Sequence, residues 1–253
     1  MNWIGLYAFV EYEISKLWRV WIQVLITPWI SALLYILIFG QVVGRRIGEI
    51  SGVSYIDFVV PGLLMMNVMQ SAFGHTSAAL FFRRFVKHIE ELLAAPLSYM
   101  EIIIGFVTGG IVRGLVVAGG VYAIALLFTI TSVSHIFLFI FYSVSVALIF
   151  ALLGILVGLW SETFEQLMIP QAFLIMPLTF LGGLFNSIHM LPEKFQWFVK
   201  INPFFYFVDG LRYSMIGISE SNRTIGFILI FALVSGLGYW VWYLFKKGYK
   251  IRT

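Results

Sequence analysis

Few residues of this 253-residue chain have the types and spacing that catalysis needs. The sequence contains no G-x-x-x-x-G-K-[ST] phosphate-binding loop, no H-E-x-x-H zinc motif and no G-x-S-x-G nucleophile turn. It has no cysteine, and its four histidines, His75, His88, His135 and His189, stand far apart. We therefore expect no catalytic residue, no metal site and no cofactor in this chain.

Polar side chains inside long apolar runs are the remaining candidates for function. Asn67, Gln70 and His75 interrupt one such run, and Arg113 interrupts another. Side chains of this kind either line a transport pathway or form hydrogen bonds between packed helices. Arg113 lies about two to three turns from the nearer end of its run, so it could also extend to the membrane surface. The sequence leaves these interpretations open.

The composition places the chain in a membrane. Hydrophobic residues make up 61% and charged residues 11%, against about 45–50% and about 25% in soluble domains. The mean hydropathy of +0.97 is too high for a soluble core of this size. A membrane-spanning helix needs about 20 apolar residues, so the length allows about six spans. We expect an all-α membrane protein with a single transmembrane domain, residues 1–253.

Runs without charged residues locate the spans. They predict six transmembrane helices, at roughly 21–40, 58–80, 101–128, 135–159, 167–184 and 224–245. Pro28 falls in the first span, and Pro170 and Pro177 fall in the fifth, so both spans are expected to bend. Glycines at small-xxx-small spacing within 105–114 predict a close approach between helices.

Three amphipathic stretches lie outside these spans. Residues 2–19 predict a helix at the membrane surface. Residues 82–95 predict a short helix that ends near Pro96, after which Ser98 and Glu101 form a capping box. Residues 186–217 predict two short helices at the opposite surface, the second one capped by Asn202 and begun by Pro203.

The net charge of +4 comes from basic residues at the span ends, which suits lipid headgroups better than nucleic acid. Six spans place both termini on one side of the membrane. Six basic residues then lie on the opposite side, and nine share the side of the termini: Lys16, Arg19, Arg83, Arg84, Lys87, Lys246, Lys247, Lys250 and Arg252. The positive-inside rule therefore predicts cytoplasmic termini.

The order of these parts resembles the permease of ATP-binding-cassette exporters of the second type, in particular small bacterial permeases. Four runs carry the resemblance: LIFG at 37–40, FVVPGLLMMNV at 58–68, IEELLAAPLS at 89–98 and INPFFYFVDGLRYSMIG at 201–217. The last run contains the pattern NP-x-x-Y-x-x-x-G-x-R, which is met by Asn202, Pro203, Tyr206, Gly210 and Arg212.

The resemblance implies partners that supply the missing chemistry. Such permeases work in the bacterial cytoplasmic (inner) membrane as a pair of six-span subunits with two separate ATP-binding-cassette subunits, which hold ATP and Mg²⁺. Residues 82–95 would be the coupling helix that docks on the ATPase, with contacts from Phe82, Arg83, Arg84, Phe85, Lys87, Glu90, Glu91 and Leu92. Residues 186–217 would be outward-facing re-entrant helices. The cargo would pass between the subunits along the first, second and fifth spans.

Two other functions remain open. An ion-coupled secondary transporter or channel would need carboxylates inside the spans, whereas the acidic residues lie at or outside the predicted span ends. A membrane scaffold would transport nothing. For an exporter, the apolar and aromatic spans suit an amphipathic cargo, such as a lipid, a drug or a glycan-lipid.

Overall fold

The computed structural model describes residues 2–129 and 133–251, so Met1, Arg252, Thr253 and part of the predicted turn between the third and fourth spans lie outside the described residues. Six helices are long and apolar enough to cross a membrane: a composite helix Ile22–Ile47, α4 (Tyr55–Phe85), α6 (Tyr99–Ala125), α7 (Ile136–Trp160), a second composite helix Phe164–Leu181, and α12 (Arg223–Lys247). Within the described ranges the strands are limited to β1 (Glu49–Ile50) and β2 (Val53–Ser54), which pair antiparallel. The predicted all-α fold with six spans is confirmed.

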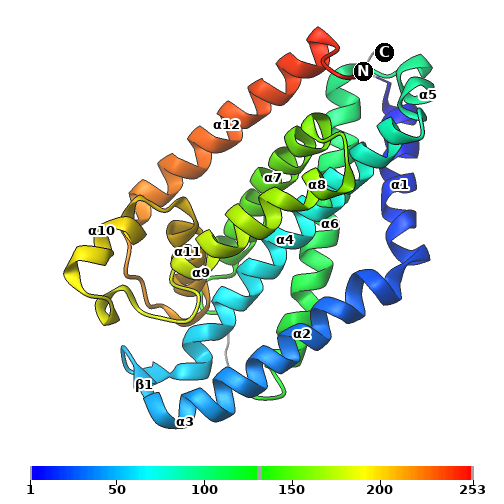
Figure 1. Ribbon diagram of the computed structural model, residues 1–253. Coiled ribbons are helices and arrows are strands. Elements are labelled where there is room, and N and C mark those ends of the chain that lie inside the picture. The colour runs from blue at the N-terminus through cyan, green and yellow to red at the C-terminus, as the bar shows by residue number, and fades with distance from the viewer. Residues whose placement is uncertain (1, 130–132, 252–253) are drawn as a thin grey trace.

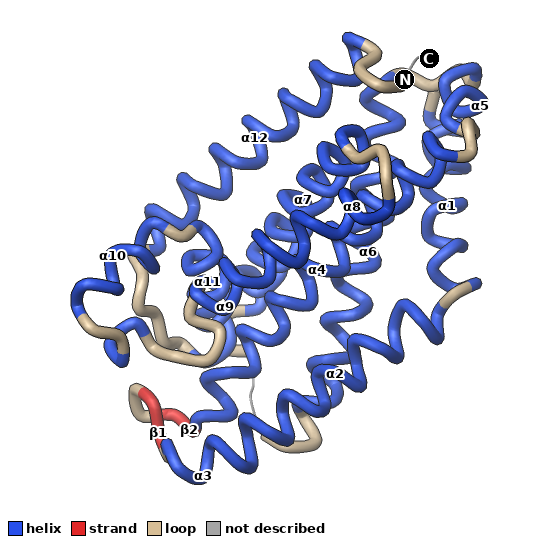
Figure 2. Tube along the Cα trace, viewed as in Figure 1, coloured by secondary structure: helices blue, strands red, loops and turns tan. Residues whose placement is uncertain are grey.

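Helix α4 forms the centre of the bundle (Figures 1 and 2). Helices α6 and α7 pack along it, and α11 (Pro203–Ile216) packs against both α4 and α7. The 31 residues of α4 span about 46 Å at 1.5 Å per residue. Between Phe58 and Phe81 all its residues are buried except Gln70, Gly74 and Ala78, which recur every four residues and so share one face.

The two composite helices contain π-helical segments next to their prolines. The first contains η1 (Ile22–Ile26), α2 (Thr27–Tyr35), η2 (Ile36–Val43) and α3 (Gly44–Ile47), and the fifth contains α8 (Phe164–Pro170), η3 (Gln171–Ile175) and α9 (Met176–Leu181). Each η segment here is a π-helical stretch. Proline lacks the N–H group for an α-helical bond, and the wider turns beside Pro28, Pro170 and Pro177 accommodate this loss. The first helix also runs past the predicted end at residue 40, because Arg45 and Arg46 end the apolar run and not the helix.

Helix α1 (Trp3–Arg19) is the helix predicted for residues 2–19, and it runs beside the first half of α6 (Figure 1). Glycines of α6 allow this contact, since a Cβ atom at Gly105 would lie 2.1 Å from the ring of Phe9. A Cβ atom at Gly109 would lie 2.6 Å from Nε2 of His75 and 3.1 Å from Cβ of Glu13. The predicted close approach at these glycines is therefore present.

The prediction of one helix over residues 82–95 is wrong. Helix α4 continues to Phe85, and a second helix, α5 (Ile89–Ala94), starts after a break. Lys87 in the break has a φ of 60°, which a continuous α-helix does not allow. The capping box of Ser98 and Glu101 then starts α6 as predicted.

The chain ends and α5 lie at one end of the bundle, which we name the α5 end (Figure 1). There Asn2 Nδ2 donates to the Pro96 carbonyl at 3.2 Å, and Lys250 accepts from Arg84. The opposite end, the α10 end, holds the β1–β2 ladder, η4 (Ile188–Met190), α10 (Glu193–Ile201) and the end of α11. Helices α10 and α11 are the two short helices expected within 186–217.

Close packing of α7 on α4 yields a stability prediction. A Cβ atom at Gly154 would lie 2.6 Å from the Phe73 carbonyl oxygen and 2.1 Å from Thr76 Oγ1. We expect Gly154→Ala to lower the free energy of unfolding by about 1–3 kcal/mol, because backbone atoms must move apart. Gly119→Ala is the matched control, since a Cβ atom there meets nothing within 4 Å. Thermal unfolding of both variants in mild detergent tests this, and equal stability would contradict it.

Candidate coupling surface and transport pathway

The residues predicted to contact an ATPase separate into an outward and an inward group. Phe82, Phe85, Lys87, Glu90 and Glu91 are exposed at the end of α4, in the break and on α5. We name these five residues the coupling surface. Phe164 at the start of α8 extends it, with ring centroids 5.3 Å from Phe82 and 5.6 Å from Phe85. Leu92 is half-buried beside this surface.

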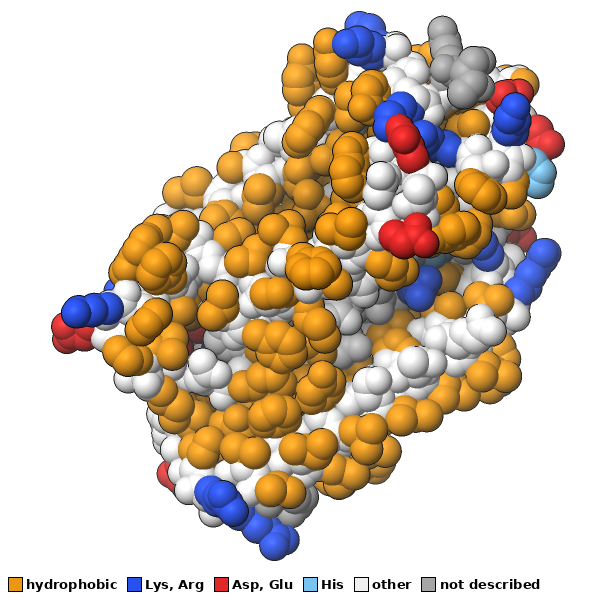
Figure 3. Space-filling model, viewed as in Figure 1, with side chains coloured by type: hydrophobic (Ala, Val, Ile, Leu, Met, Phe, Trp, Pro, Cys, Tyr) orange, Lys and Arg blue, Asp and Glu red, His pale blue; other side chains and the backbone are white. Residues whose placement is uncertain are grey.

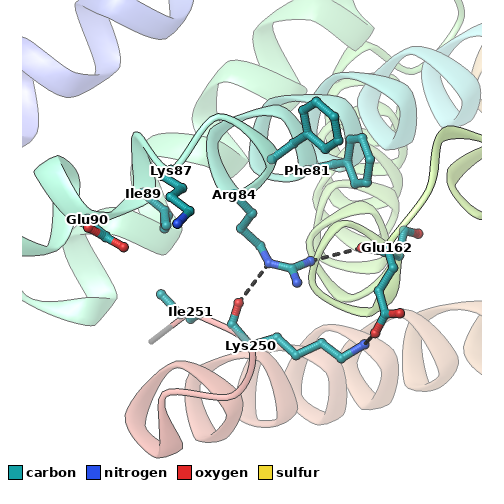
Figure 4. Close-up of a pocket in the computed structure, with 10 residues that line it drawn as sticks. Phe81, Arg84, Lys87, Ile89, Glu90, Glu162, Lys250 and Ile251 are labelled. Carbon is teal, nitrogen blue, oxygen red and sulfur yellow. Dashed lines mark hydrogen bonds and ion pairs between the residues drawn. The ribbon is translucent and has the colours of Figure 1, made fainter. Parts of the chain in front are cut away.

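Arg84 points inward, so its predicted contact with a partner is replaced by internal ones. Its Nη1 donates to the carbonyl oxygens of Gly158, Leu159 and Ser161 at 2.8, 2.7 and 3.1 Å. These carbonyl groups lie at the end of α7, where no N–H group of the helix is available to donate to them. Arg84 therefore caps α7. Its Nε donates to the carbonyl of Lys250 at 2.8 Å, which ties the segment after α12 to α4 (Figure 4).

A pocket of about 220 Å³ lies between the end of α4, α5, the α7–α8 turn and the segment after α12 (Figure 4). Lys250 Nζ donates to Glu162 Oε1 at 2.6 Å across its rim. The hydrogen bond and the positive charge of Lys250 lower the pKa of the Glu162 carboxyl. The pocket is therefore a small recess with both signs of charge, directly beside the coupling surface.

Arg83 also points inward, to a carboxylate that the sequence interpretation missed. Its Nη2 lies 2.5 Å from Glu13 Oε1, and His75 Nε2 lies 3.3 Å from Glu13 Oε2. The guanidinium of Arg83 also covers the ring of Phe9, 4.8 Å from its centroid. Glu13 itself is fully buried. This cluster fastens α1 to the last turns of α4.

Burial raises the pKa of Glu13, but the close approach of His75 and the positive charge of Arg83 outweigh this effect, and the pKa falls below its usual value. Glu13 thus stays ionised inside the protein. A sequence signal for this role exists: Leu6, Phe9, Glu13 and Leu17 are the buried residues of α1 and fall at helical spacing. A carboxylate within an apolar stripe indicates a buried partner.

The pathway candidates do not form one group. Asn67, Gln70 and Arg113 line a pocket of about 450 Å³, which we name the span pocket, whereas His75 belongs to the Glu13 cluster. The span pocket lies between α2, α4, α6 and the α8–α9 segment. Arg113 stands near the middle of α6, about 20 Å along the helix from its first residue, and its Nε is buried. This position favours the pathway interpretation for Arg113.

The signature at 201–217 positions helices at the α10 end. Asn202 caps α11 through Phe204 N–H at 3.0 Å, Pro203 begins that helix, and Tyr206 donates to the Lys200 carbonyl at 2.9 Å. Gly210 leaves room for Tyr142, whose ring would lie 2.2 Å from an added Cβ atom. These residues do not reach the span pocket.

Arg212 is fully buried and joins three segments. It donates to the Phe58 carbonyl at 3.2 Å and the Gly183 carbonyl at 2.5 Å, and its guanidinium stacks on Phe58 at 3.8 Å. Asp209, another buried acid that the sequence interpretation did not use, accepts from the backbone N–H groups of Glu220 and Ser221 at 2.9 Å each. The signature therefore holds α11 to the start of α4 and to the loop before α12.

Comparisons with known proteins cover all these features. Residues 5–216 match the sequence model of the family described as ABC-2 type transporter. The chain is 36% identical over 254 residues to the inner membrane transport permease YadH of Escherichia coli (strain K12), a match that covers 100% of this chain and 99% of that protein. It is 26% identical over 190 residues to nodulation protein J of Rhizobium meliloti (strain 1021), covering 73% and 71%. It is 25% identical over 198 residues to nodulation protein J of Bradyrhizobium diazoefficiens, covering 77% and 76%.

The Glu13 cluster yields a second prediction. Glu13→Gln leaves the half-buried Arg83 without its charged partner, so we expect a loss of about 1–3 kcal/mol in the free energy of unfolding. Glu11→Gln, an exposed site on the same helix, should change little. Because the pKa of Glu13 is lowered on folding, its stabilisation is present above about pH 4.3 and is lost as the pH falls through the lowered value. Thermal unfolding measured across a range of pH checks this. If Glu13→Gln lost stability at low pH in the same way as the wild type, the prediction would be contradicted.

Proposed function

The chain belongs to the ABC-2 type transporter family and is a transport permease, and from this premise we propose that it exports an amphipathic cargo as a homodimer driven by two separate ATP-binding subunits. The Escherichia coli relative is named an inner membrane transport permease. The cargo, the dimer and the export direction are part of the proposal.

The energy for transport must come from a partner in this proposal, since the sequence contains no nucleotide-binding motif. ATP and Mg²⁺ would be held by the soluble subunits, where hydrolysis takes place. The permease contributes a surface that receives the movement and helices that carry it to the cargo.

The coupling surface is the observation that carries the proposal. Two exposed aromatic rings, Phe82 and Phe85, stand beside the exposed carboxylates Glu90 and Glu91. A short helix with apolar and acidic side chains suits a groove on a soluble protein with complementary charge. The surface also stands on a firm base, because Arg83 and Arg84 tie the end of α4 to α1, α7 and the segment after α12.

Movement at the coupling surface would travel along α4. This helix starts at the α10 end, where the carbonyl of Phe58 accepts from Arg212, and it ends at the coupling surface. A displacement of the end of α4 would therefore reach α11 along one continuous helix. Along the way α4 forms one wall of the span pocket.

The proposed cargo route follows the first, second and fifth spans. These three spans, together with Arg113 of the third, line the span pocket. A second copy of the chain facing this pocket would complete a route between subunits, with α10 and α11 at its outer end as re-entrant helices. The apolar and polar lining suits an amphipathic lipid, drug or glycan-lipid.

We place the chain in the bacterial inner membrane, as the name of the E. coli relative indicates for that protein. The α5 end would face the cytoplasm, where the ATPase resides. Lys16, Lys246 and Lys247 lie toward this end, which agrees with the positive-inside rule. An ion-coupled transporter gains no support, because the buried Glu13 and Asp209 bind internal partners.

Purification tests the proposal directly. The chain is isolated from its native membrane in mild detergent, and a stoichiometric ATP-binding-cassette subunit should accompany it. Reversing charge with Glu90→Lys plus Glu91→Lys should reduce the bound ATPase by about tenfold or more, since close charge pairs at interfaces contribute about 1.5 kcal/mol or more. The control is Glu49→Lys plus Glu193→Lys, two exposed acids at the α10 end. Full ATPase binding by the first variant would reject this coupling surface, and isolation of the chain alone would reject the exporter.

A further inference from the structure

The span pocket contains a positive charge that no acidic residue of its lining balances. Arg113 contributes to the lining, and none of the described residues around the pocket is Asp or Glu. Arg113 Nε is buried, and among the described residues it has no hydrogen-bond partner. The side chain also lines a smaller pocket between α6 and the α1–η1 junction, whose other lining residues are all apolar.

Glu13 is the buried carboxylate that lies beside this face of α6, and it already has a charged partner. Gly109 lies one turn before Arg113 and faces His75 and Glu13. Glu13 gives one oxygen to Arg83 at 2.5 Å, and its other oxygen faces His75 at 3.3 Å. The charges of Glu13 and Arg83 cancel, so the positive charge of Arg113 remains without a counter-charge.

A cation at this depth is expensive to maintain unless something binds it. Charged side chains within spans face a bundle interior or an aqueous cavity and mark transport pathways. A guanidinium prefers carboxylate, phosphate or sulfate oxygens, with which it forms paired hydrogen bonds. The missing partner of Arg113 is therefore expected to be an oxyanion that arrives from outside the chain.

The rest of the pocket indicates what the oxyanion is attached to. Gln70 and Gln171 provide amides, and Thr27 and Ser31 provide hydroxyl groups for a polar headgroup. Met66, Met168 and Met176 provide flexible apolar contacts for a chain. The space-filling view shows a largely hydrophobic surface on the face that carries α2 and α8, which allows a tail to extend into lipid (Figure 3).

We propose that the span pocket takes the anionic headgroup of an amphipathic cargo and that Arg113 binds its oxyanion. This inference rests on the proposed export function, and it narrows the cargo class from amphipathic to anionic and amphipathic. Neutral sterol-like or cationic drug-like molecules are not the expected cargo. Asn67 also lines the pocket; its Nδ2 donates to the Leu63 carbonyl at 2.8 Å, and its side-chain oxygen can accept from a hydroxyl group of the headgroup.

The test measures binding by the full-length chain without any ATPase. The chain in dodecyl maltoside is mixed with equal amounts of phosphatidylglycerol and phosphatidylcholine that have identical acyl chains, and native mass spectrometry counts the retained lipid. The wild type should retain phosphatidylglycerol about tenfold better, the ratio that corresponds to ~1.4 kcal/mol. Inorganic phosphate at the same concentration should not displace it, because phosphate lacks the apolar tail.

Variants assign the preference to Arg113. Arg113→Met should abolish it, and Arg113→Lys should keep most of it by keeping the charge. Arg46→Gln removes an exposed positive charge at the α10 end and should leave the preference unchanged. Because Arg113→Met removes a buried cation without a partner, its unfolding temperature should equal or exceed that of the wild type.

Three results would overturn the inference. They are equal retention of the two lipids by the wild type, an unchanged preference in Arg113→Met, and a clear fall in the unfolding temperature of that variant, which would reveal an internal partner. Complete displacement by inorganic phosphate would also overturn it, because a free anion would then be sufficient. None of these results depends on an ATPase, so failure here is distinguishable from failure of the exporter proposal.

Discussion

The close contact of α6 and α7 with α4 is the interaction on which the rest of the structure depends. In lipid, apolar side chains gain little by leaving their surroundings, so helices associate through tight packing and hydrogen bonds. Gly110 on α6 and Gly154 on α7 bring these helices within contact of α4 backbone atoms. Thr76 Oγ1 then donates to the Ala151 carbonyl of α7 at 2.9 Å. The three helices form a firm core that carries everything else.

Buried charges fix the two ends of this core. Arg84 caps α7 and Arg83 binds Glu13 at the α5 end, while Arg212 joins Phe58 and Gly183 at the α10 end. Each of these arginines binds oxygen atoms of the chain itself, so their charges stabilise the packing of the helices. Arg113 differs from them because its neighbours offer it no carboxylate. The contrast between paired and unpaired arginines is what separates the scaffold from the candidate pathway.

Hydropathy was sufficient to predict the spans, because membrane helices need long apolar runs whatever their neighbours are. The break at Lys87 was not predictable, since an amphipathic pattern continues across a change of backbone direction. The inward turn of Arg83 and Arg84 depends on Glu13 and on the end of α7, which are distant in the sequence. Asn67, Gln70 and Arg113 were identified by their polarity alone, but only the packing of the second span against the third brings them to one pocket.

The floor and the sides of the span pocket differ in the regularity of their helices. Its floor is α4, which is held on both flanks by α6 and α7, whereas its sides are α2, between two π stretches, and the α8–α9 segment, which contains a third. π-helical turns are rare departures from the α-helical hydrogen-bond pattern, and they occur frequently at functional sites. If the sides move and the floor stays in place, the width of the pocket changes while its depth stays constant. Such a cavity can accept headgroups of different width and still present the guanidinium of Arg113 at the same depth.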